Sequence, residues 1–386
     1  MKAESEQVTV LVTDAGYPQT LGAVRALARA GYRVDAIGQG KHVVRCSRYL
    51  TRIAYDDRRF TEEHFPEFLA FLRDAHYDVL LPIGAKSVLL AAAHLPEISQ
   101  HCAVPLPSPA AIETCMDKLR VYQLALQQGV LAPRTWHITS SDDLEVVRQE
   151  AAFPVVLKGR YEVDPRPCHY VTAPEELSPA FTAWCAQGGE GAETLAQEYI
   201  QGEGCGFFGL YQHGELRRCF MHRRLREVPA TGGASCCAES IFAQDLLDAG
   251  EALMAPLQWH GVVMVEFKRQ RDTGTLYLME INAKFWGSLD LAIAAGVNFP
   301  ALAAQVALGE DVPRSCAYAV GLRYHWPFGD GELLHLRQRP RDWGAFLRDC
   351  LNPRVKSNVW YTDLLPTLRL ALKDVAHLLG LGQRGR

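Results

Sequence analysis

The sequence has no excess of positive charge and no long uncharged apolar stretch. Its 386 residues carry 40 Lys and Arg against 44 Asp and Glu, so no global positive field exists to attract a nucleic-acid backbone. No uncharged segment reaches the roughly 18 residues that a membrane span needs, and the opening MKAESEQVTVLV lacks a basic segment followed by a long apolar one. We therefore expect a cytoplasmic protein without a membrane span and without a nucleic-acid partner.

Several catalytic and metal-binding signatures are also missing. The eleven cysteines are odd in number and scattered, and no C-x-x-C pair suggests zinc or redox chemistry. We expect reduced, mostly buried thiols rather than a disulfide framework. No G-x-S-x-G motif suggests a serine nucleophile, and the turn after the first apolar run, TDAGYPQTLG, lacks the G-x-G-x-x-G of a dinucleotide site.

Strand-like and helix-like patterns alternate in the N-terminal third. The expected elements are strands at 8–12, 33–38 and 78–84, with helices at 21–32 and 63–75 between them. This alternation predicts a parallel sheet with helices on its faces. Three prolines between 105 and 109 mark a break, and we expect a domain boundary near residue 112.

Compact strands and hairpins follow the break. Residues 153–160 (FPVVLKGR) and 195–204 predict strands, and residues 207–225 predict a hairpin that turns at His213-Gly214. Residues 261–283 predict a second, clearer hairpin.

The second hairpin brings acidic residues together. If it turns at Asp272-Thr273-Gly274, Glu266 faces Glu280, although a G1 bulge would shift this register by one. Asn282 shares the face of Glu280 because side chains alternate along a strand. Facing carboxylates repel, whereas carboxylate and amide oxygens are the ligands that suit Mg²⁺. The hairpin predicts a metal site; the alternative is a solvated face on which both carboxylates pair with lysines.

Six ordered motifs are spread through a region of about residues 8–312. They are DKLRVYQLALQQGVLAPRTW (117–136), FPVVLK (153–158), QEYIQGEG (197–204), RRLREVPATGGAS (223–235), VEFK (265–268) and EINAKFWGSLDLAIAAGVNFP (280–300). In this order they resemble the ATP-grasp superfamily, especially the branch similar to the large subunit of carbamoyl phosphate synthetase. The resemblance implies a mixed α/β and α+β fold: an N-terminal Rossmann-like domain (1–112), then an ATP-grasp domain (113–312) with a mobile lid lobe at about 135–202. Residues 313–386 form an extension outside the resemblance, which we expect to govern substrate selectivity or to pack against the core.

The resemblance also assigns roles to single residues. Lys118 and Lys158 would contact ATP phosphates, Glu198 would lie at the adenine amino group with Tyr199 and the Ile200 backbone beside the ring, and Glu203 would accept from the ribose hydroxyls. Glu266, Glu280 and Asn282 would hold Mg²⁺, with Mn²⁺ as an alternative.

Two cations are expected at the transferred phosphate or the acceptor, where Asn282 also contributes to catalysis. Arg224 shares a strand face with Arg226 ahead of a glycine turn and is expected to bind substrate or phosphate; a solvated basic edge is the alternative. Lys284 stands in NAK where the family usually has Arg in NPR, so a cation is kept but the bidentate fork is lost. After Lys158, GRYEVDPRPCHY also departs from the Gly- and Ser-rich lid loop of the family.

The resemblance implies a biosynthetic ADP-forming ligase. Such enzymes phosphorylate a small-molecule or peptide-like carboxylate with ATP, and an amine or thiol then displaces phosphate from the acyl phosphate. Catalysis of this kind depends on positioning and charge neutralisation, so no nucleophilic Ser or Cys is needed. The alternatives are a carboxy-phosphate or carbamate-forming enzyme similar to the synthetase, or a non-catalytic ATP-binding sensor or scaffold. A homodimer is the default assembly.

The segment 363–380 predicts a last amphipathic helix. Leu364, Leu368, Leu372, Val375 and Leu379 fall on one face, and Arg369, Lys373 and His377 fall on another. We expect the apolar face to dock against the protein's own core or a dimer partner rather than a membrane surface.

Overall fold

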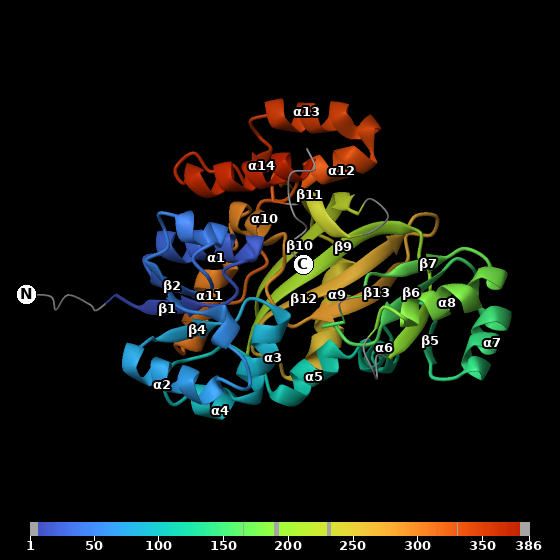
Figure 1. Cartoon of the computed structure of the whole chain (residues 1–386), viewed down its shortest axis with the longest axis horizontal. Coiled ribbons are helices and arrows are strands. Elements are labelled where there is room, and N and C mark those ends of the chain that lie inside the picture. Colours follow the sequence, from blue (N-terminus) through green and yellow to red (C-terminus); the bar gives the residue numbers. More distant parts are fainter. Residues whose placement is uncertain (1–6, 165, 189–192, 230–232, 330, 379–386) are drawn as a thin grey trace, which may run out of the picture.

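Three β-sheets organise the chain (Figure 1). The computed structural model describes residues 7–378, apart from 165, 189–192, 230–232 and 330. A four-stranded parallel sheet comes first, a four-stranded antiparallel sheet lies at the other end of the molecule, and a seven-stranded sheet lies between them. Within the described residues, no helix is both long and apolar enough to cross a membrane.

The N-terminal region is the expected parallel sheet, with strand order β3-β2-β1-β4. Its elements are β1 (Thr9–Val12), α1 (Pro18–Arg29), β2 (Arg33–Ile37), η1 (Val43–Cys46), β3 (Arg52–Tyr55), η2 (Asp57–Arg59), α2 (Phe65–Ala75), β4 (Val79–Leu81), α3 (Ala85–Ala93), α4 (Leu95–Ile98) and α5 (Pro109–Met116). The strands predicted at 8–12, 33–38 and 78–84 are confirmed, and each contains at least three consecutive buried residues, all apolar except Asp35 in β2. The sequence pattern does not predict strand β3, since its residues RIAY are at most partly buried and show no clear alternation.

The antiparallel sheet has strand order β5-β8-β6-β7 and is covered by two helices. Its elements, which follow α6 (Lys118–Gln127), are β5 (Thr135–Ile138), α7 (Ser141–Glu150), β6 (Val155–Gly159), β7 (His169–Val171), η3 (Pro174–Glu176), α8 (Leu177–Cys185) and β8 (Thr194–Glu198). A small separate core holds this region together, with Trp184 and Leu157 buried in it.

The seven-stranded sheet has order β13-β12-β9-β10-β11-β14-β15 and carries most of the candidate residues. Its first part contains β9 (Gly202–Gln212), β10 (Glu215–Val228), β11 (Ala234–Ser240), α9 (Gln244–Met254), η4 (Ala255–Leu257), β12 (Gly261–Gln270), β13 (Leu276–Asn282), α10 (Leu289–Ala294) and α11 (Phe299–Ala307). Alternation along β9 sends Phe208 and Leu210 into the core shared with α1, and Phe207 and Tyr211 into the core shared with α5 and α9. The hairpin predicted at 207–225 is confirmed, with left-handed His213 and Gly214 at its turn.

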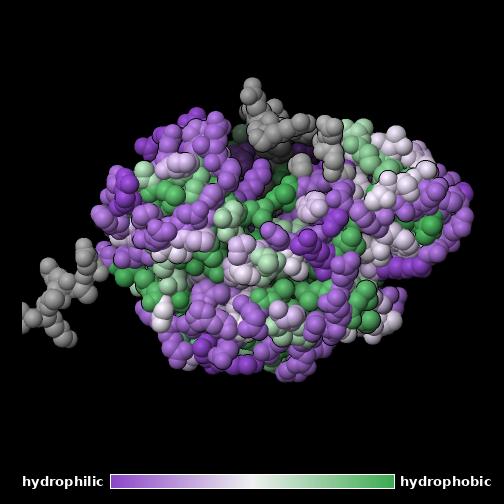
Figure 2. Space-filling model, turned by 90° about the horizontal axis from the view of Figure 1, so that it is seen from below, coloured by the Kyte–Doolittle hydropathy of each residue, from purple (hydrophilic) through white to green (hydrophobic). Residues whose placement is uncertain are grey.

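The C-terminal residues are not a separate appendage. Two of their strands, β14 (Arg323–His325) and β15 (Lys356–Ser357), extend the central sheet beyond β11, and the helices α12 (Glu332–Gln338), α13 (Trp343–Leu351) and α14 (Leu364–Leu378) lie together at the top of Figure 1, with η5 (Pro340–Asp342) between the first two. A three-residue and a two-residue strand are too short to give a period-2 signal, so sequence reasoning missed both. The face of the molecule away from these helices is mostly hydrophilic, with apolar residues in separate patches (Figure 2).

Two expectations from the sequence need correction. The apolar face of the last helix was expected to dock against the protein's own core or a dimer partner. The first alternative is wrong, because Leu364, Leu368, Leu372 and Val375 each remain 43–68% exposed. The dimer alternative stays a prediction, and Leu379 lies outside the described residues.

The thiols are also not all reduced, because Cys219 and Cys316 form a disulfide. Ser315 exchanges backbone hydrogen bonds with β10: its N–H donates to the Arg217 carbonyl at 2.8 Å, and its carbonyl accepts from the Cys219 N–H at 3.3 Å. This pairing places Cys316 beside Cys219. The two cysteines are 97 residues apart in the sequence, so no local spacing could have indicated the bond.

Candidate active site

The predicted hairpin forms, and Glu266 lies directly opposite Glu280. Near the turn the register differs from the prediction, since Gln270 rather than Arg271 pairs with Thr275. A bulge between Glu266 and Phe267 then adds one residue to β13 and restores the predicted pair. The prediction that the two carboxylates face each other is therefore correct because the one-residue shift at the turn and the one-residue bulge cancel.

Ten of the eleven candidate residues line one cavity of about 450 Å³. They are Lys118, Lys158, Glu198, Tyr199, Ile200, Arg224, Glu266, Glu280, Asn282 and Lys284. The cavity lies between the antiparallel sheet and the central sheet, and Gln19 from the N-terminal region and Trp286 after β13 close other parts of its wall. Residues that are far apart in the sequence therefore meet in one place, as the ordered motifs predict.

Glu203 is the exception. It follows Gly202 in β9 and pairs with Arg223 at 3.8 Å, and it lines a neighbouring cavity of about 650 Å³. The adjacent Gly204, not Glu203, faces Arg224: a Cβ at Gly204 would lie 2.8 Å from the Arg224 Cδ. Period-2 alternation thus turns the Glu203 side chain away from the first cavity, and of the other candidates only Arg224 lines both cavities.

Asn282 links the carboxylate of Glu280 to a lysine. Its Nδ2 donates to Glu280 Oε1 at 2.8 Å, and its Oδ1 accepts from Lys284 Nζ at 2.6 Å. The ammonium of Lys284 also pairs with Glu162, which in turn lies 3.5 Å from Lys118 Nζ. One carboxylate that the sequence analysis missed therefore bridges two of the predicted phosphate-binding or acceptor-binding lysines.

Lys158 is held from two sides in the wall of the cavity. Its Nζ donates to Gln197 Oε1 at 2.7 Å and to the hydroxyl of Tyr122. The Tyr122 hydroxyl donates in turn to the Met279 carbonyl at 3.0 Å. Burial alone would lower the pKa of Lys158, but its hydrogen bond to the Tyr122 oxygen and the nearby Glu280 carboxylate raise it above its ordinary value, so the lysine stays cationic.

Arg224 joins the metal-ligand candidates to the end of β10. Its Nη2 pairs with Glu266 Oε2 at 2.5 Å, and its Nη1 donates to the Gly233 carbonyl at 2.9 Å and to Glu227 at 3.3 Å. Its Nε is buried without a hydrogen-bond partner among the described residues. Arg226 does not share this face as predicted, because a register shift after Arg224 turns it toward Glu332 and Asp349.

The end of the cavity next to the antiparallel sheet is lined by Glu198, Tyr199 and Ile200, with Lys268 beside them. The Glu198 carboxylate accepts from the Ala152 backbone at 3.3 Å, and Lys268 Nζ donates to the Ile200 carbonyl at 3.2 Å. The same ammonium lies 4.5 Å above the ring of Tyr199.

The two facing carboxylates titrate in opposite directions. Burial raises the pKa of Glu266, only partly offset by Arg224, and the charge of Glu280 raises it further. Burial would also raise the pKa of Glu280, but Lys118, the amide of Asn282 and Lys284 outweigh it and lower that pKa. Glu280 is therefore firmly ionised, whereas keeping Glu266 ionised costs free energy. A cation bound between the two carboxylates would lower that cost.

The charges that line the cavity balance. Its cations are Lys118, Lys158, Arg224, Lys268 and Lys284, and its carboxylates are Glu162, Glu198, Glu227, Glu266 and Glu280. A ligand with a large net negative charge would upset this balance unless cations entered with it.

A buried histidine supports the wall near Trp286. His222 Nε2 lies 2.8 Å from the hydroxyl of Ser288, which lines the cavity. Burial lowers the pKa of His222 to about 3, so the ring is neutral. Ser288 lies within the 280–300 motif, but nothing in the sequence indicates its contact with His222.

The loop after Lys158 is tied down, in keeping with its departure from a Gly- and Ser-rich sequence. Arg160 pairs with Asp117 and with Glu193, the latter at 2.7 Å. Arg166 is 8% exposed, pairs with Asp164 at 2.6 Å and stacks 3.6 Å from the Trp184 ring. The loop that contributes Glu162 is thus anchored at both ends.

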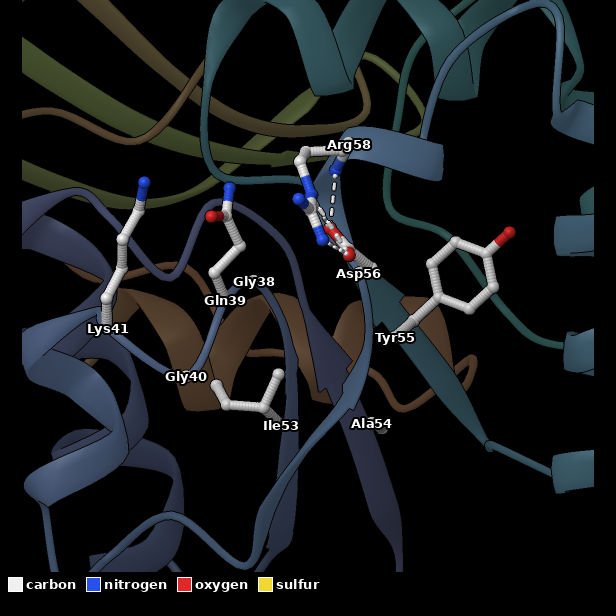
Figure 3. A pocket seen from close by; sticks show the side chains of 9 residues that line it. All are labelled: Gly38, Gln39, Gly40, Lys41, Ile53, Ala54, Tyr55, Asp56 and Arg58. Carbon is white, nitrogen blue, oxygen red and sulfur yellow. Dashed lines mark hydrogen bonds and ion pairs between the residues drawn. The ribbon is translucent and has the colours of Figure 1, made fainter.

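A separate cavity of about 410 Å³ lies at the carboxyl end of β2 (Figure 3). Its charged residues are Lys41, Asp56 and Arg58, and the last two are paired with each other. It brings together neither facing carboxylates nor converging lysines, so we place the candidate site in the cavity between the two antiparallel sheets.

Comparisons with known proteins agree with this geometry. Residues 191–327 match the family described as ATP-grasp in the biosynthetic pathway with Ter operon. The chain is 23% identical over 244 residues to the carbamoyl phosphate synthase large chain of Micrococcus luteus, covering 61% of this chain and 22% of that protein. It is 31% identical over 173 residues to the ribosomal protein bS6--L-glutamate ligase of Salmonella schwarzengrund, covering 42% of this chain and 56% of that protein.

A solved structure extends the likeness beyond the matched segments. Biotin carboxylase from Campylobacter jejuni superposes with a TM-score of 0.67 over 82% of this chain and 74% of that chain, at 15% identity. The chain spans only about a fifth and about half of the two curated relatives, so their activities are not transferred with the fold. Residues 191–327 therefore carry an ATP-grasp family match, and the chain shares its overall fold with biotin carboxylase.

Proposed function

We propose that the protein is an ATP-dependent, ADP-forming ligase that joins a small-molecule or peptide-like carboxylate to an amine or thiol through an acyl phosphate. The observation that carries this proposal is the meeting of Lys118, Lys158 and Lys284 with Glu266, Glu280 and Asn282 in one cavity. Cations on flexible stems neutralise phosphate oxygens, and hard oxygen ligands hold the divalent ions that accompany them. The glutamate ligase among the relatives supports the C–N bond-forming class.

The nucleotide would lie along the wall formed by β6, β8 and β12. Tyr199 and the Ile200 backbone would border the adenine, and the Glu198 carboxylate would accept from its amino group. Lys118 and Lys158 would contact the phosphates. Since Glu203 turns toward the neighbouring cavity, we do not assign the ribose to it.

The donor set fits Mg²⁺. Glu266 and Glu280 face each other across the hairpin, Asn282 lies on the same face, and burial raises the cost of keeping Glu266 ionised without a cation. A triphosphate alone would upset the balanced charge of the lining, whereas a triphosphate that enters with divalent cations would not. Bound Mg²⁺ would supply neutralisation of the charge on the phosphates.

Arg224 and Lys284 would hold the acceptor side. Lys284 is paired with Glu162, so an incoming phosphate or carboxylate would take the place of the Glu162 carboxylate beside that ammonium. In the reaction, a carboxylate oxygen forms a bond to the γ-phosphorus as the bond to ADP breaks. The amine or thiol then bonds to the acyl carbon, phosphate leaves and the nucleophile loses its proton. Arg224, Lys284 and Asn282 would orient the groups that exchange bonds.

A carboxy-phosphate or carbamate-forming enzyme is the second candidate. Both the carbamoyl phosphate synthase large chain and biotin carboxylase are among the similar proteins. In that case bicarbonate would be the acid that receives the phosphoryl group. A non-catalytic ATP-binding sensor or scaffold is disfavoured by the complete set of lysines and oxygen ligands.

An ADP-release assay tests the proposal. The full chain would be incubated with ATP and Mg²⁺ against pooled carboxylic acids and amines or thiols, with a bicarbonate arm and a Glu280→Gln control. We expect one acid pool, combined with an amine or thiol pool, to raise ADP release above the ATP-only rate. Stimulation by bicarbonate alone would favour the second candidate. ATP binding without stimulation by any pool would overturn the ligase proposal in favour of a sensor.

We further propose the division into residues 1–112, 113–312 and 313–386, with a lid at about 135–202. The separate core of the antiparallel sheet supports the lid as a unit, while the strands β14 and β15 tie the last region to the central sheet. Mn²⁺ in place of Mg²⁺, a homodimeric assembly and a cytoplasmic location stay predictions.

A further inference from the structure

Exposed apolar side chains are concentrated in the last part of the chain. Among the described residues, 18 large hydrophobic side chains are exposed, and half of them fall within residues 343–375. These nine are Trp343, Leu347, Leu351, Tyr361, Leu364, Leu365, Leu368, Leu372 and Val375. Scattered exposed hydrophobic residues need no explanation, but their concentration on two neighbouring helices (Figure 1) marks a candidate interaction surface.

The exposed residues form stripes on helices that are already docked by another face. In α13, Trp343, Leu347 and Leu351 follow the i, i+4, i+8 spacing of one helix face. In α14, Leu364, Leu368 and Leu372 do the same. The opposite side of α14 packs inward through Leu370, Thr367 and Asp374, which are 8% exposed or less. The stripes are therefore not required to hold the helices on the protein.

The carboxylates of this stretch all point inward. Asp349 pairs with Arg323 at 2.9 Å and with Arg226, and Asp363 pairs with Arg25 at 2.8 Å. Asp374 accepts from the Gly329 backbone at 2.7 Å. These three are the only Asp or Glu residues between 343 and 376, and each is at most 4% exposed.

The cations of the same stretch all point outward. Arg348, Arg354, Lys356, Arg369 and Lys373 are exposed. A chain with a formal net charge of −4 thus presents, on α13, α14 and their connection, a surface of apolar and cationic side chains without an exposed carboxylate. Such a surface is complementary to a partner with negative charges on its surface and an apolar layer directly beneath them.

We propose that the surface formed by α13, α14 and the segment between them binds the surface of an anionic phospholipid membrane. Apolar stripes flanked by Lys and Arg are the pattern of helices that lie in the lipid interface, with leucines among the acyl chains and cations at the headgroup phosphates. A second copy of the chain fits less well, because a closed two-fold contact through this face would bring the same cations together. The proposal does not depend on the ligase activity.

Vesicle co-sedimentation of the full chain tests the proposal. The protein is mixed with vesicles of phosphatidylcholine alone or of phosphatidylcholine with phosphatidylglycerol, at low and at high salt. We expect binding to the vesicles that contain phosphatidylglycerol, at least 10-fold weaker binding to phosphatidylcholine alone, and release by high salt, because surface charge interactions are screened. Equal binding to both vesicle types, or no binding to either, would overturn the proposal.

Two double variants distinguish membrane binding through this surface from non-specific hydrophobic binding through any exposed leucine. Leu368→Ser with Leu372→Ser removes half-exposed to largely exposed leucines of α14, and Leu126→Ser with Leu131→Ser removes leucines of similar exposure elsewhere. We expect the first variant to lose binding at least 10-fold while it melts like the unmodified chain, and the second to bind normally. Equal loss in both would sink the proposal. So would a concentration-dependent dimer, measured by sedimentation velocity, that only the first variant abolishes.

Discussion

The cavity between the two antiparallel sheets and the outer surface of α13 and α14 use the same kinds of side chain in opposite ways. In the cavity, five cations face five carboxylates, and each of the ten has an ion-pair or hydrogen-bond partner within the protein. On the outer surface, the five cations between residues 343 and 376 are exposed. The three carboxylates of the same stretch are buried and form ion pairs or hydrogen bonds inside the protein. A balanced site suits a ligand that enters as a neutral ensemble, such as a nucleotide with its metal ions, whereas an unbalanced surface suits a partner that keeps its own negative charge.

Removing one cavity carboxylate is the largest test of this comparison. Glu280→Gln keeps the shape but removes a charge that Lys118, Asn282 and Lys284 stabilise. We expect ADP release to fall about 1,000-fold, as for loss of a group that acts directly on transition-state charge. The measurement is the steady-state rate with the acid and amine pools identified in the ADP-release assay.

Glu203→Gln is the matched control for that variant. The Glu203 side chain lies in the neighbouring cavity and pairs with Arg223, so we expect less than about a threefold change in rate. If Glu203→Gln lowered the rate as much as Glu280→Gln, Glu203 would take part in catalysis despite lying in the neighbouring cavity. Its expected role at the ribose hydroxyls would then be restored.

Two leucines of α14 allow the contributions of its buried and its exposed side to the free energy of unfolding to be compared. Leu370 is 8% exposed and Leu372 is 68% exposed. We expect Leu370→Ala to lower the free energy of unfolding by about 2–4 kcal/mol and Leu372→Ala to change it by less than about 0.5 kcal/mol. Chemical denaturation of both variants gives the two values, and similar losses would mean that Leu372 contributes to the core after all.

How far the sequence predicts the molecule depends on the kind of signal. The facing of Glu266 and Glu280 followed from strand alternation and a turn, yet the turn register was off by one and a bulge corrected it. Glu203 shows the limit of a motif, because alternation along β9 turns its side chain to the face opposite to that of Gly204. Glu162 could not be found at all, since its pairing with Lys284 joins residues 122 positions apart through a loop without a motif.

The exposed leucines of α14 teach a related lesson. The sequence periodicity of α14 showed that one face is apolar, but periodicity does not tell which face meets the protein. Here the inward face is set by Asp363, Thr367, Leu370 and Asp374, and three of these four residues are polar. Buried hydrogen bonds and ion pairs such as Asp363 with Arg25 decided the orientation, and in that pair the partner lies 338 residues away.

A neutral histidine beneath the cavity wall gives a pH test. The pKa of His222 is lowered to about 3, so between about pH 3 and its unfolded value near 6.5 the unfolded chain binds the extra proton. Its contribution to stability is therefore present above pH 6.5 and is lost as the pH falls, by about 1.4 kcal/mol for each unit. We expect the unmodified chain to lose about 2 kcal/mol more than His222→Asn between pH 7 and pH 5 in urea unfolding. Equal losses would show that the ring becomes charged without cost.

The smallest expected effect concerns the lysine that replaces the usual arginine. Lys284 is a single ammonium that contacts both Asn282 and Glu162, and those two contacts share one point charge. An arginine fork could make the same two contacts through separate nitrogens and would hold Glu162 more firmly, so an anion would displace that carboxylate less readily. Lys284→Arg should therefore raise the KM for the acceptor acid by about two- to fivefold while kcat changes less. A change in kcat alone would place Lys284 at the transferred phosphate, and a change in which acid is accepted would make it a determinant of specificity.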